Sequence, residues 1–420
     1  MTVAPFVRPF LSELHGQVAQ YLPHADLQSY ALASWAFNKE ANRFLWRAVM
    51  VSPDVQRPPA LEEFVRALKR DPVRASFIRH LSFVPEIDGP KFVAVRIFPK
   101  DLSDKFWTSL EEALRLVTRL QSIGLLTAPD ACVRYWKDSQ FSDRFTNIIS
   151  NVFKSSRIQN FHAYLRPDRL FQLCQTWPSL ITLRAERVSE DAFADLPPDA
   201  LPQLRHLESD TRLMSHISPG RAIETWYHTG EWCNDFTDDF KLLTSTIRSC
   251  TTLQRVRVEC RASSESDAGS YFPAFAHDTL RNFHLKVFFE AEAIGYDPKE
   301  GGFRLTPSLV MQALPSGALA LFPKLEVLQI ILSHHDFEFA ADGDIETVAN
   351  ELASFLMLEG HGMLHQVDVD CSFYRHDDWT WGATRFRATR HDGRWNVEVV
   401  TCSGWKPSIV PKFDEFLVGH

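Results

Sequence analysis

The sequence lacks features that mark several large classes of protein. It has no apolar run near the roughly 18 residues that span a bilayer, and its first thirty residues contain no basic start followed by an apolar block. Its seven cysteines are scattered and never spaced Cys-x-x-Cys, which argues against a disulfide framework and a zinc site. We therefore expect an intracellular protein, cytoplasmic or nuclear, with reduced thiols.

Signatures of common catalytic sites are also missing. There is no GxSxG elbow, HExxH helix or Walker A loop. His334-His335-Asp336 invites a metal hypothesis, but adjacent strand residues point to opposite faces and no third ligand follows at a suitable spacing. We expect no enzymatic activity, no cofactor and no metal. An enzyme hidden in degenerate repeats stays open as an alternative.

The overall composition favours a folded protein without a general affinity for nucleic acid or membranes. Hydrophobic residues make up 45% and charged residues 23% of the 420 residues, which argues against wholesale disorder. A chain of this length divides into domains or forms a repeat array. The formal charge of −8 gives no general attraction to nucleic acid or to an anionic membrane, so neither is an expected partner.

Three short helices are predicted in the first fifty residues. Pro23 ends the first, Asp26 is expected to cap the second, and the third runs from about Trp35 to Trp46. Three such helices make a small core, so they normally rest on a neighbouring domain and often on a partner.

This segment resembles the F-box family. The matching positions, about one eighth of the chain, are Glu13-Leu14, Val18, Tyr21-Leu22, Asp26-Leu27, Leu32-Ala33-Ser34 and Leu45-Trp46-Arg47. The sequence departs from the family at Leu11, where a proline is usual, and at Trp35. The resemblance implies docking on a Skp adaptor, and through it on a cullin scaffold, by Leu11, Leu14, Val18, Leu22, Asp26, Leu27, Leu32, Ser34 and Trp46. The alternative is that these residues only pack as a helical cap.

An apolar triplet spaced Leu-x-x-Leu-x-Leu recurs along the rest of the chain, from about Ala75 to Phe373. Helical patterns precede several triplets, so the unit is a helix, a short turn and a strand. Such an array resembles the leucine-rich repeats that follow F-boxes in many receptors, notably in fungi. The triplets are Ile78/Leu81/Phe83, Leu120/Ile123/Leu125, Leu180/Leu183/Ala185, Leu204/Leu207, Leu253/Val256/Val258, Leu280/Phe283/Leu285, Leu325/Leu328/Ile330 and Leu364/Val367/Val369.

The predicted fold is α/β, with three parts. Residues 1–52 form the F-box-like motif, residues 53–373 a curved, horseshoe-like helix–strand solenoid, and residues 374–420 a cap with a β-hairpin that turns at Asp392-Gly393. Glu259 to Ser270 and Ala291 to Phe303 are expected to be exposed loops, and Met214 to Asp235 fits the repeat poorly.

The predicted substrate site is the polar face of the strands. Its expected residues are Arg184, Glu186, Glu208, Arg257, Glu259, His284, Lys286, Gln329, Asp368 and Asp370. A mixed-charge strip of this kind suits a protein partner better than a phosphate backbone, but a merely solvated face is an equally open interpretation. The F-box resemblance implies that the chain is the substrate-recognition subunit of a Skp–cullin–F-box ubiquitin ligase, with an unknown protein substrate on this face. The alternative is a stand-alone interaction scaffold.

Overall fold

A computed structural model describes residues 12–405, except for 52–59, 84–102, 126–139, 164, 166, 186–192, 194–195, 198, 230–237, 263–266, 290–302, 306–310, 312, 335–336, 340–341 and 376–379. The chain divides into two compact units, Met1–Leu204 and Arg205–His420. This boundary lies inside the predicted solenoid. Within the described residues, no helix is both long and apolar enough to cross a bilayer.

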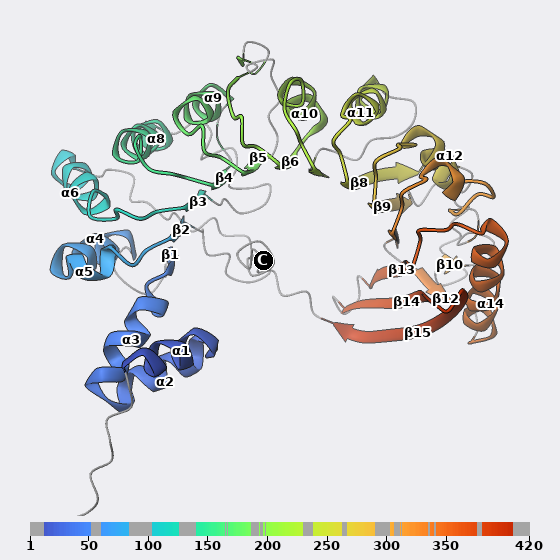
Figure 1. The fold of residues 1–420 in the computed structure, drawn as a ribbon, viewed down its shortest axis with the longest axis horizontal. Coiled ribbons are helices and arrows are strands. Elements are labelled where there is room, and N and C mark those ends of the chain that lie inside the picture. The colour runs from blue at the N-terminus through green and yellow to red at the C-terminus, as the bar shows by residue number, and fades with distance from the viewer. Residues whose placement is uncertain are drawn as a thin grey trace, which may run out of the picture. The chain divides into compact units, whose positions relative to one another are not determined.

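The first unit begins with three helices, α1 (Ser12–Tyr21), α2 (His24–Ala33) and α3 (Trp35–Leu45). Five parallel strands follow in the order of the chain, with helices between them on one side (Figure 1). These elements are β1 (Ala48–Val51), α4 (Ala60–Arg70), α5 (Pro72–Ala75), β2 (His80–Phe83), α6 (Asp104–Leu114), β3 (Ser122–Leu125), α8 (Gln140–Val152), β4 (Asn160–Ala163), α9 (Pro167–Thr176) and β5 (Thr182–Ala185).

The second unit continues the same alternation. Strands β6, β7, β8, β9, β11 and β13 are parallel neighbours. Its elements are β6 (His206–Ser209), α10 (Thr211–Ile217), β7 (Thr225–His228), α11 (Asp238–Ser249), β8 (Arg255–Ala262), α12 (Asp267–Ala274), β9 (Asn282–Phe289), β10 (Phe303–Leu305), η3 (Leu319–Leu321), β11 (Val327–His334), β12 (Phe337–Phe339), α14 (Asp342–Glu359), β13 (Gln366–Arg375), β14 (Thr380–His391) and β15 (Arg394–Trp405).

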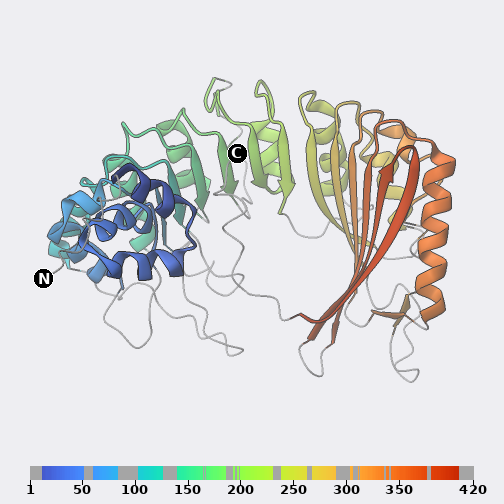
Figure 2. The same ribbon diagram turned by 60° about the horizontal axis from the view of Figure 1, so that its bottom comes forward.

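An antiparallel hairpin, β14–β15, extends the last parallel strand of the second unit. Strand β14 pairs with β13, and β15 pairs with β14. Figure 2 shows these strands side by side, with helix α14 beside them. Asp392 and Gly393 have φ of 50° and 78°, the left-handed conformations that a two-residue hairpin turn requires. The predicted hairpin is confirmed.

The apolar triplets form the core of each repeat. All their members are buried, and the middle and last residues lie on the same face of the strand because side chains alternate along it. Two repeats that the sequence pattern missed have the same arrangement, Ile158/Phe161/Ala163 on β4 and Ile223/Trp226/His228 on β7. The segment from Met214 is therefore a regular repeat in which tryptophan and histidine replace the usual aliphatic residues.

Within each unit, backbone hydrogen bonds join neighbouring repeats in one recurring way. The carbonyl oxygen of the residue before a strand accepts from two consecutive N–H groups of the following repeat. In the first unit, Arg79 O accepts from Gln121 and Ser122 at 2.8 and 2.9 Å. In the second unit, Glu224 O accepts from Gln254 and Arg255 at 2.8 and 3.0 Å. The recurrence fixes the strand register from repeat to repeat.

Two local predictions are wrong. The segment from Glu259 to Ser270 is not simply a loop, because β8 continues to Ala262 and α12 begins at Asp267. The polar residues of β8 alternate with buried Val258 and Cys260 and pair with β9, so the polarity reflects one face of a strand. Asp26 is not a helix cap, because α2 begins at His24 and Asp26 lies in its first turn. Residues 291–302 of the other predicted loop lie outside the described residues.

Replacing Trp226 by alanine should lower the free energy of unfolding by about 3–5 kcal/mol, because the side chain is fully buried and leaves a large cavity. Trp35 is the matched control: its side chain is 82% exposed, so Trp35→Ala should change stability by less than about 0.5 kcal/mol. Denaturant unfolding followed by circular dichroism measures both. Equal losses for the two variants would contradict the assignment of Trp226 to a repeat core.

Candidate binding face on the strands

All the predicted polar residues of the second unit except Glu208 line up across neighbouring strands. The strand register gives one row of Arg257, His284, Gln329, Asp368 and Arg387, from β8 to β14. A second row, two residues further along β8, contains Glu259, Lys286, Ile331, Asp370 and Arg385. Because the core residues of these strands occupy the alternate positions, both rows lie on the face opposite the core. We call these ten residues the strand face.

A three-residue charge cluster occupies the β8–β9 part of the strand face. Arg257 Nη2 donates to Glu259 Oε1 at 2.9 Å, and Lys286 Nζ donates to Glu259 Oε2 at 3.3 Å. Burial by itself raises the pKa of Glu259, but the charges of Lys286 and Arg257 outweigh it and lower the pKa below its ordinary value. Glu259 is therefore an anion that holds two cations in place.

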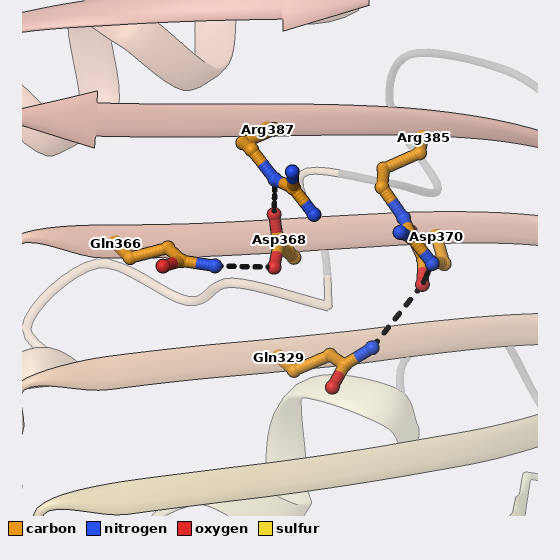
Figure 3. A network of polar contacts seen from close by, with 6 residues as sticks. All are labelled: Gln329, Gln366, Asp368, Asp370, Arg385 and Arg387. Carbon is orange, nitrogen blue, oxygen red and sulfur yellow. Dashed lines mark hydrogen bonds and ion pairs between the residues drawn. The ribbon is translucent and has the colours of Figure 1, made fainter. Parts of the chain in front are cut away.

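A second cluster joins β11, β13 and β14 (Figure 3). Asp370 accepts from Arg385 through both carboxylate oxygens and also from Gln329 Nε2 at 3.2 Å. Asp368 accepts from Arg387 Nε at 2.9 Å and from Gln366 Nε2 at 2.7 Å. Both carboxylates are almost inaccessible to solvent, whereas about two fifths of each arginine side chain is exposed.

The second cluster attaches the hairpin to the repeat array. Each aspartate on β13 lies directly opposite an arginine on β14 in the antiparallel register. Buried carboxylates need such partners, since an unpaired buried charge is costly. Both aspartates are predicted site residues, whereas Arg385 and Arg387 are not. The alternation Arg385-Phe386-Arg387-Ala388 was the available signal, because it places both arginines on one face.

His284 lies between the two clusters. Burial, the largest effect, and the positive charge of Arg257 lower the pKa of His284 to about 4. The imidazole is therefore neutral near pH 7, and its buried Nε2 has no hydrogen-bond partner within the part of the chain that the structure describes. His284 contributes no charge to the strand face at neutral pH.

The other predicted strand residues have different positions. Glu208 lies on β6, opposite Tyr227 of β7, and belongs to the second unit. Arg184 lies on β5 of the first unit, opposite His162. Burial and Arg184 lower the pKa of His162 well below its ordinary value. Glu186 lies outside the described residues.

The described side chains show no arrangement that suggests catalysis. Among them, no group of three His, Cys, Asp or Glu residues is placed to hold a metal ion. His335 and Asp336 of the metal hypothesis lie outside the described residues. Burial raises the pKa of the Cys250 and Cys371 thiols, which disfavours the reactive thiolate form.

The three N-terminal helices divide the predicted adaptor residues into buried and exposed groups. Leu27 is buried in the small core formed with Ala19, Ala31 and Ala41, and Leu22 packs against that core. The prediction that Leu27 lies on a docking face is therefore wrong, because its side chain completes the fold of the helices. Leu11 lies outside the described residues, and the structure gives no description of the Leu14 side chain.

Several large apolar side chains of these helices are exposed. Leu32 and Trp35, at the junction of α2 and α3, are 87% and 82% exposed. Val18 and Tyr21, on the last two turns of α1, are also exposed. We call these four residues the exposed apolar set. Val18 and Leu32 are predicted adaptor-binding residues, Tyr21 is one of the positions that match the F-box family, and Trp35 is a departure from that family.

Two further predicted residues have structural contacts. Ser34 caps α3, because its hydroxyl accepts from Phe37 N at 3.2 Å. The Arg74 guanidinium lies 5.5 Å from the centroid of a Trp46 ring, which joins the end of the helical motif to α5. Both residues therefore have roles in the fold of the first unit. Asp26 is exposed and has no capping role.

The geometry defines a class of protein, one built from helix–strand repeats with a core on one face of the strands and polar side chains on the other. No family model and no curated protein match the chain. A solved structure titled "Crystal structure of TLR13-ssRNA13 complex" has 11% sequence identity and a TM-score of 0.32, over 73% of this chain and 38% of that one. The chain thus matches well under half of that protein's length, and the similarity is too low to support a functional argument.

Replacing Arg385 by methionine should lower the free energy of unfolding by about 3 kcal/mol, because the buried Asp370 carboxylate loses its charged partner. The control is Arg115→Met on α6. Its ion pair with Glu111 is exposed, so the loss should be below about 1 kcal/mol. Denaturant titration of each variant measures the difference, and similar losses would argue against a stabilising role of the second cluster.

His284 should make the fold less stable in acid. Its folded-state pKa, about 4, lies below the unfolded value of about 6.5, so the unfolded state binds more protons as pH falls from about 6.5 to 4. His284→Asn should therefore lose about 1–2 kcal/mol less stability than wild type between pH 7 and pH 5. Denaturant unfolding at both pH values tests this. Equal losses of stability in the two proteins would contradict the lowered pKa of His284.

Proposed function

We propose that the chain is the substrate-recognition subunit of a Skp–cullin–F-box ubiquitin ligase. The N-terminal helices bind the Skp adaptor, and the strand face binds a protein substrate. The chain then brings substrate lysines near the ubiquitin-carrying enzyme and accelerates transfer by proximity, without a catalytic residue of its own. A cytoplasmic or nuclear location accords with this role.

The observation that carries the adaptor proposal is the exposed apolar set. Val18, Tyr21, Leu32 and Trp35 lie in a motif whose own buried core consists mainly of small residues. Burying such side chains against a partner is favourable at about 25 cal/mol per Å² of apolar surface. Large apolar side chains that are exposed in so small a motif are candidates for a contact with a partner.

The strand face supports the substrate half of the proposal. Its charged residues are held by ion pairs on regular strands, so a partner meets a surface whose side chains already have fixed positions. The mixture of both signs suits a protein surface better than nucleic acid.

The main alternative is a scaffold that does not bind Skp. The contact between Arg74 and Trp46 favours the scaffold alternative, because this contact joins the helical motif to the repeat that follows. In this case the helices serve as an N-terminal cap, and the exposed apolar set contacts a different partner.

The double variant Val18→Asp and Leu32→Asp should abolish binding to a purified Skp adaptor, because each change places an unpaired charge in the proposed apolar contact. Both side chains are exposed, so the fold should be retained, as circular dichroism and thermal melting can verify. A pull-down with wild-type and variant protein gives the result.

Val73→Asp is the matched control, since Val73 on α5 is 64% exposed and lies outside the three-helix motif. It should bind the adaptor as wild type does. Failure of wild type to bind any Skp adaptor would overturn the receptor proposal and favour the scaffold. Retained binding by the folded double variant would show that the exposed apolar set is not the contact.

A further inference from the structure

In the second unit, opposite charges occupy the position directly before neighbouring strands. Arg205 Nε, before β6, lies 3.5 Å from Glu224 Oε1, before β7. Arg281 Nη1, before β9, lies 2.8 Å from Glu326 Oε1, before β11. Each pair joins two repeats by a charge contact in addition to the backbone hydrogen bonds at the same position.

In the first unit, the same position carries like charges. Arg47 precedes β1 and Arg79 precedes β2, and Arg47 O accepts from Arg79 N at 2.9 Å. The Arg79 side chain extends to the next repeat, where its Nη1 donates to Arg119 O at 3.1 Å. Arg157, in the turn before β4, corresponds to Arg119, since each directly precedes the first buried residue of a triplet. We call these four arginines the basic turn set.

The turns and strands that carry the basic turn set contain no acidic residue. Residues 46–51, 76–83, 115–125 and 153–163 are all described, and none is aspartate or glutamate. Within the described part of the chain, no ion pair joins the basic turn set to a carboxylate. The carboxylates that most closely precede the first three turns along the chain have other partners: Glu40 pairs with Arg43, Asp71 with Arg74, and Glu112 with Lys69.

The positive charges act on one another at this edge of the strands. Burial and the charges of Arg119 and Arg47 lower the pKa of Arg79. Burial and the charges of Arg47 and Arg79 lower the pKa of His80 to about 4, so this imidazole is neutral near pH 7. No described carboxylate contributes to either shift. The negative charge that glutamate supplies between repeats of the second unit has no counterpart among these residues.

We propose that the basic turn set binds a compact anion with two or more phosphate groups, which contacts Arg47, Arg79 and Arg119. Planar guanidinium groups bind phosphate oxygens through paired N–H donors. The anion supplies the charge between repeats that glutamate supplies in the second unit, so binding also stabilises the first unit. Such a site can operate in a receptor or in a scaffold, because Arg79 and Arg119 lie outside the three-helix motif.

The strand spacing sets the size of the ligand. Strands β1, β2 and β3 are parallel neighbours about 4.8 Å apart, so the turns that precede them span about 10 Å. One phosphate group for each repeat therefore requires phosphates about 5 Å apart. A short chain of linked phosphates fits within this span.

Nucleic acid fits these turns less well. Single strands bind by stacking bases on aromatic rings, but Phe77 and Trp46 already have a guanidinium over the ring. The Cζ atoms of Arg43 and Arg74 lie 6.0 and 5.5 Å from the two ring centroids. The formal charge of −8 on the chain also opposes a long polyanion. Single-stranded RNA is therefore a competing ligand in the test.

The test is isothermal titration calorimetry of the full-length protein with inorganic tripolyphosphate, at about 0.15 M salt. Wild type should bind, and Arg119→Glu should weaken binding about tenfold or more, because it reverses an exposed charge at the site. Arg119→Gln, which removes the charge without reversing it, should weaken binding less. Arg394→Glu, the same reversal at an exposed position of β15, is the matched control and should leave the affinity unchanged.

Thermal melting gives a second readout, in which Arg119→Glu differs from a variant that is merely damaged. Tripolyphosphate at about 100 times its Kd should raise the Tm of wild type by about 5 °C. Without the anion, Arg119→Glu should melt at the same temperature as wild type or higher, because its carboxylate replaces a like charge beside Arg79. Tripolyphosphate should then add little to its Tm.

Several outcomes would overturn the inference. Absence of tripolyphosphate binding and equal affinity in Arg119→Glu are two of them. An equal rise in Tm with sodium sulfate at the same ionic strength would be a third, because it would show only general screening of like charges. Tighter, Arg119-dependent binding of single-stranded RNA or of a phosphoserine peptide would be a fourth, because the ligand would then be a macromolecule. The adaptor pull-down tests the proposed function separately.

Discussion

Each repeat of this protein depends on its neighbour, because an isolated strand can neither pair its backbone hydrogen-bonding groups nor bury its apolar side chains. Within each unit, the carbonyl oxygen before a repeat strand accepts from two N–H groups of the next repeat, as Glu224 O does from Gln254 and Arg255. The apolar triplets on successive strands are likewise buried by stacking. A local defect such as a core cavity therefore affects adjacent repeats as well.

This dependence also determines where polar residues can serve a function. Since alternate side chains of each strand belong to the core, the remaining positions are available on the opposite face at a fixed spacing across the strands. In the second unit, these positions carry two kinds of charge cluster. The Asp–Arg pairs on β13 and β14 attach the hairpin, whereas Glu259 joins Arg257 to Lys286 across β8 and β9. The first kind joins the hairpin to the repeat array, and the second joins two neighbouring repeats.

The N-terminal helices present a different balance. Their core is small, and Leu32 and Trp35 remain in solvent although both are large apolar residues. Arg74 over Trp46 shows that the same motif contacts the first repeat. The motif thus contacts the first repeat and also has exposed apolar residues that suit a partner. Both the receptor and the scaffold interpretations are therefore compatible with its structure.

The sequence alone determined the helix–strand unit and most triplets, because aliphatic residues at fixed spacing depend only on local periodicity. The β7 repeat was missed since Trp226 and His228 do not fit an aliphatic pattern, although they occupy equivalent positions. Only the tertiary structure paired Asp368 and Asp370 with Arg387 and Arg385, assigned Leu27 to the core and left Leu32 exposed. These facts depend on strand register and on packing between helices, which bring together residues that sequence spacing cannot relate.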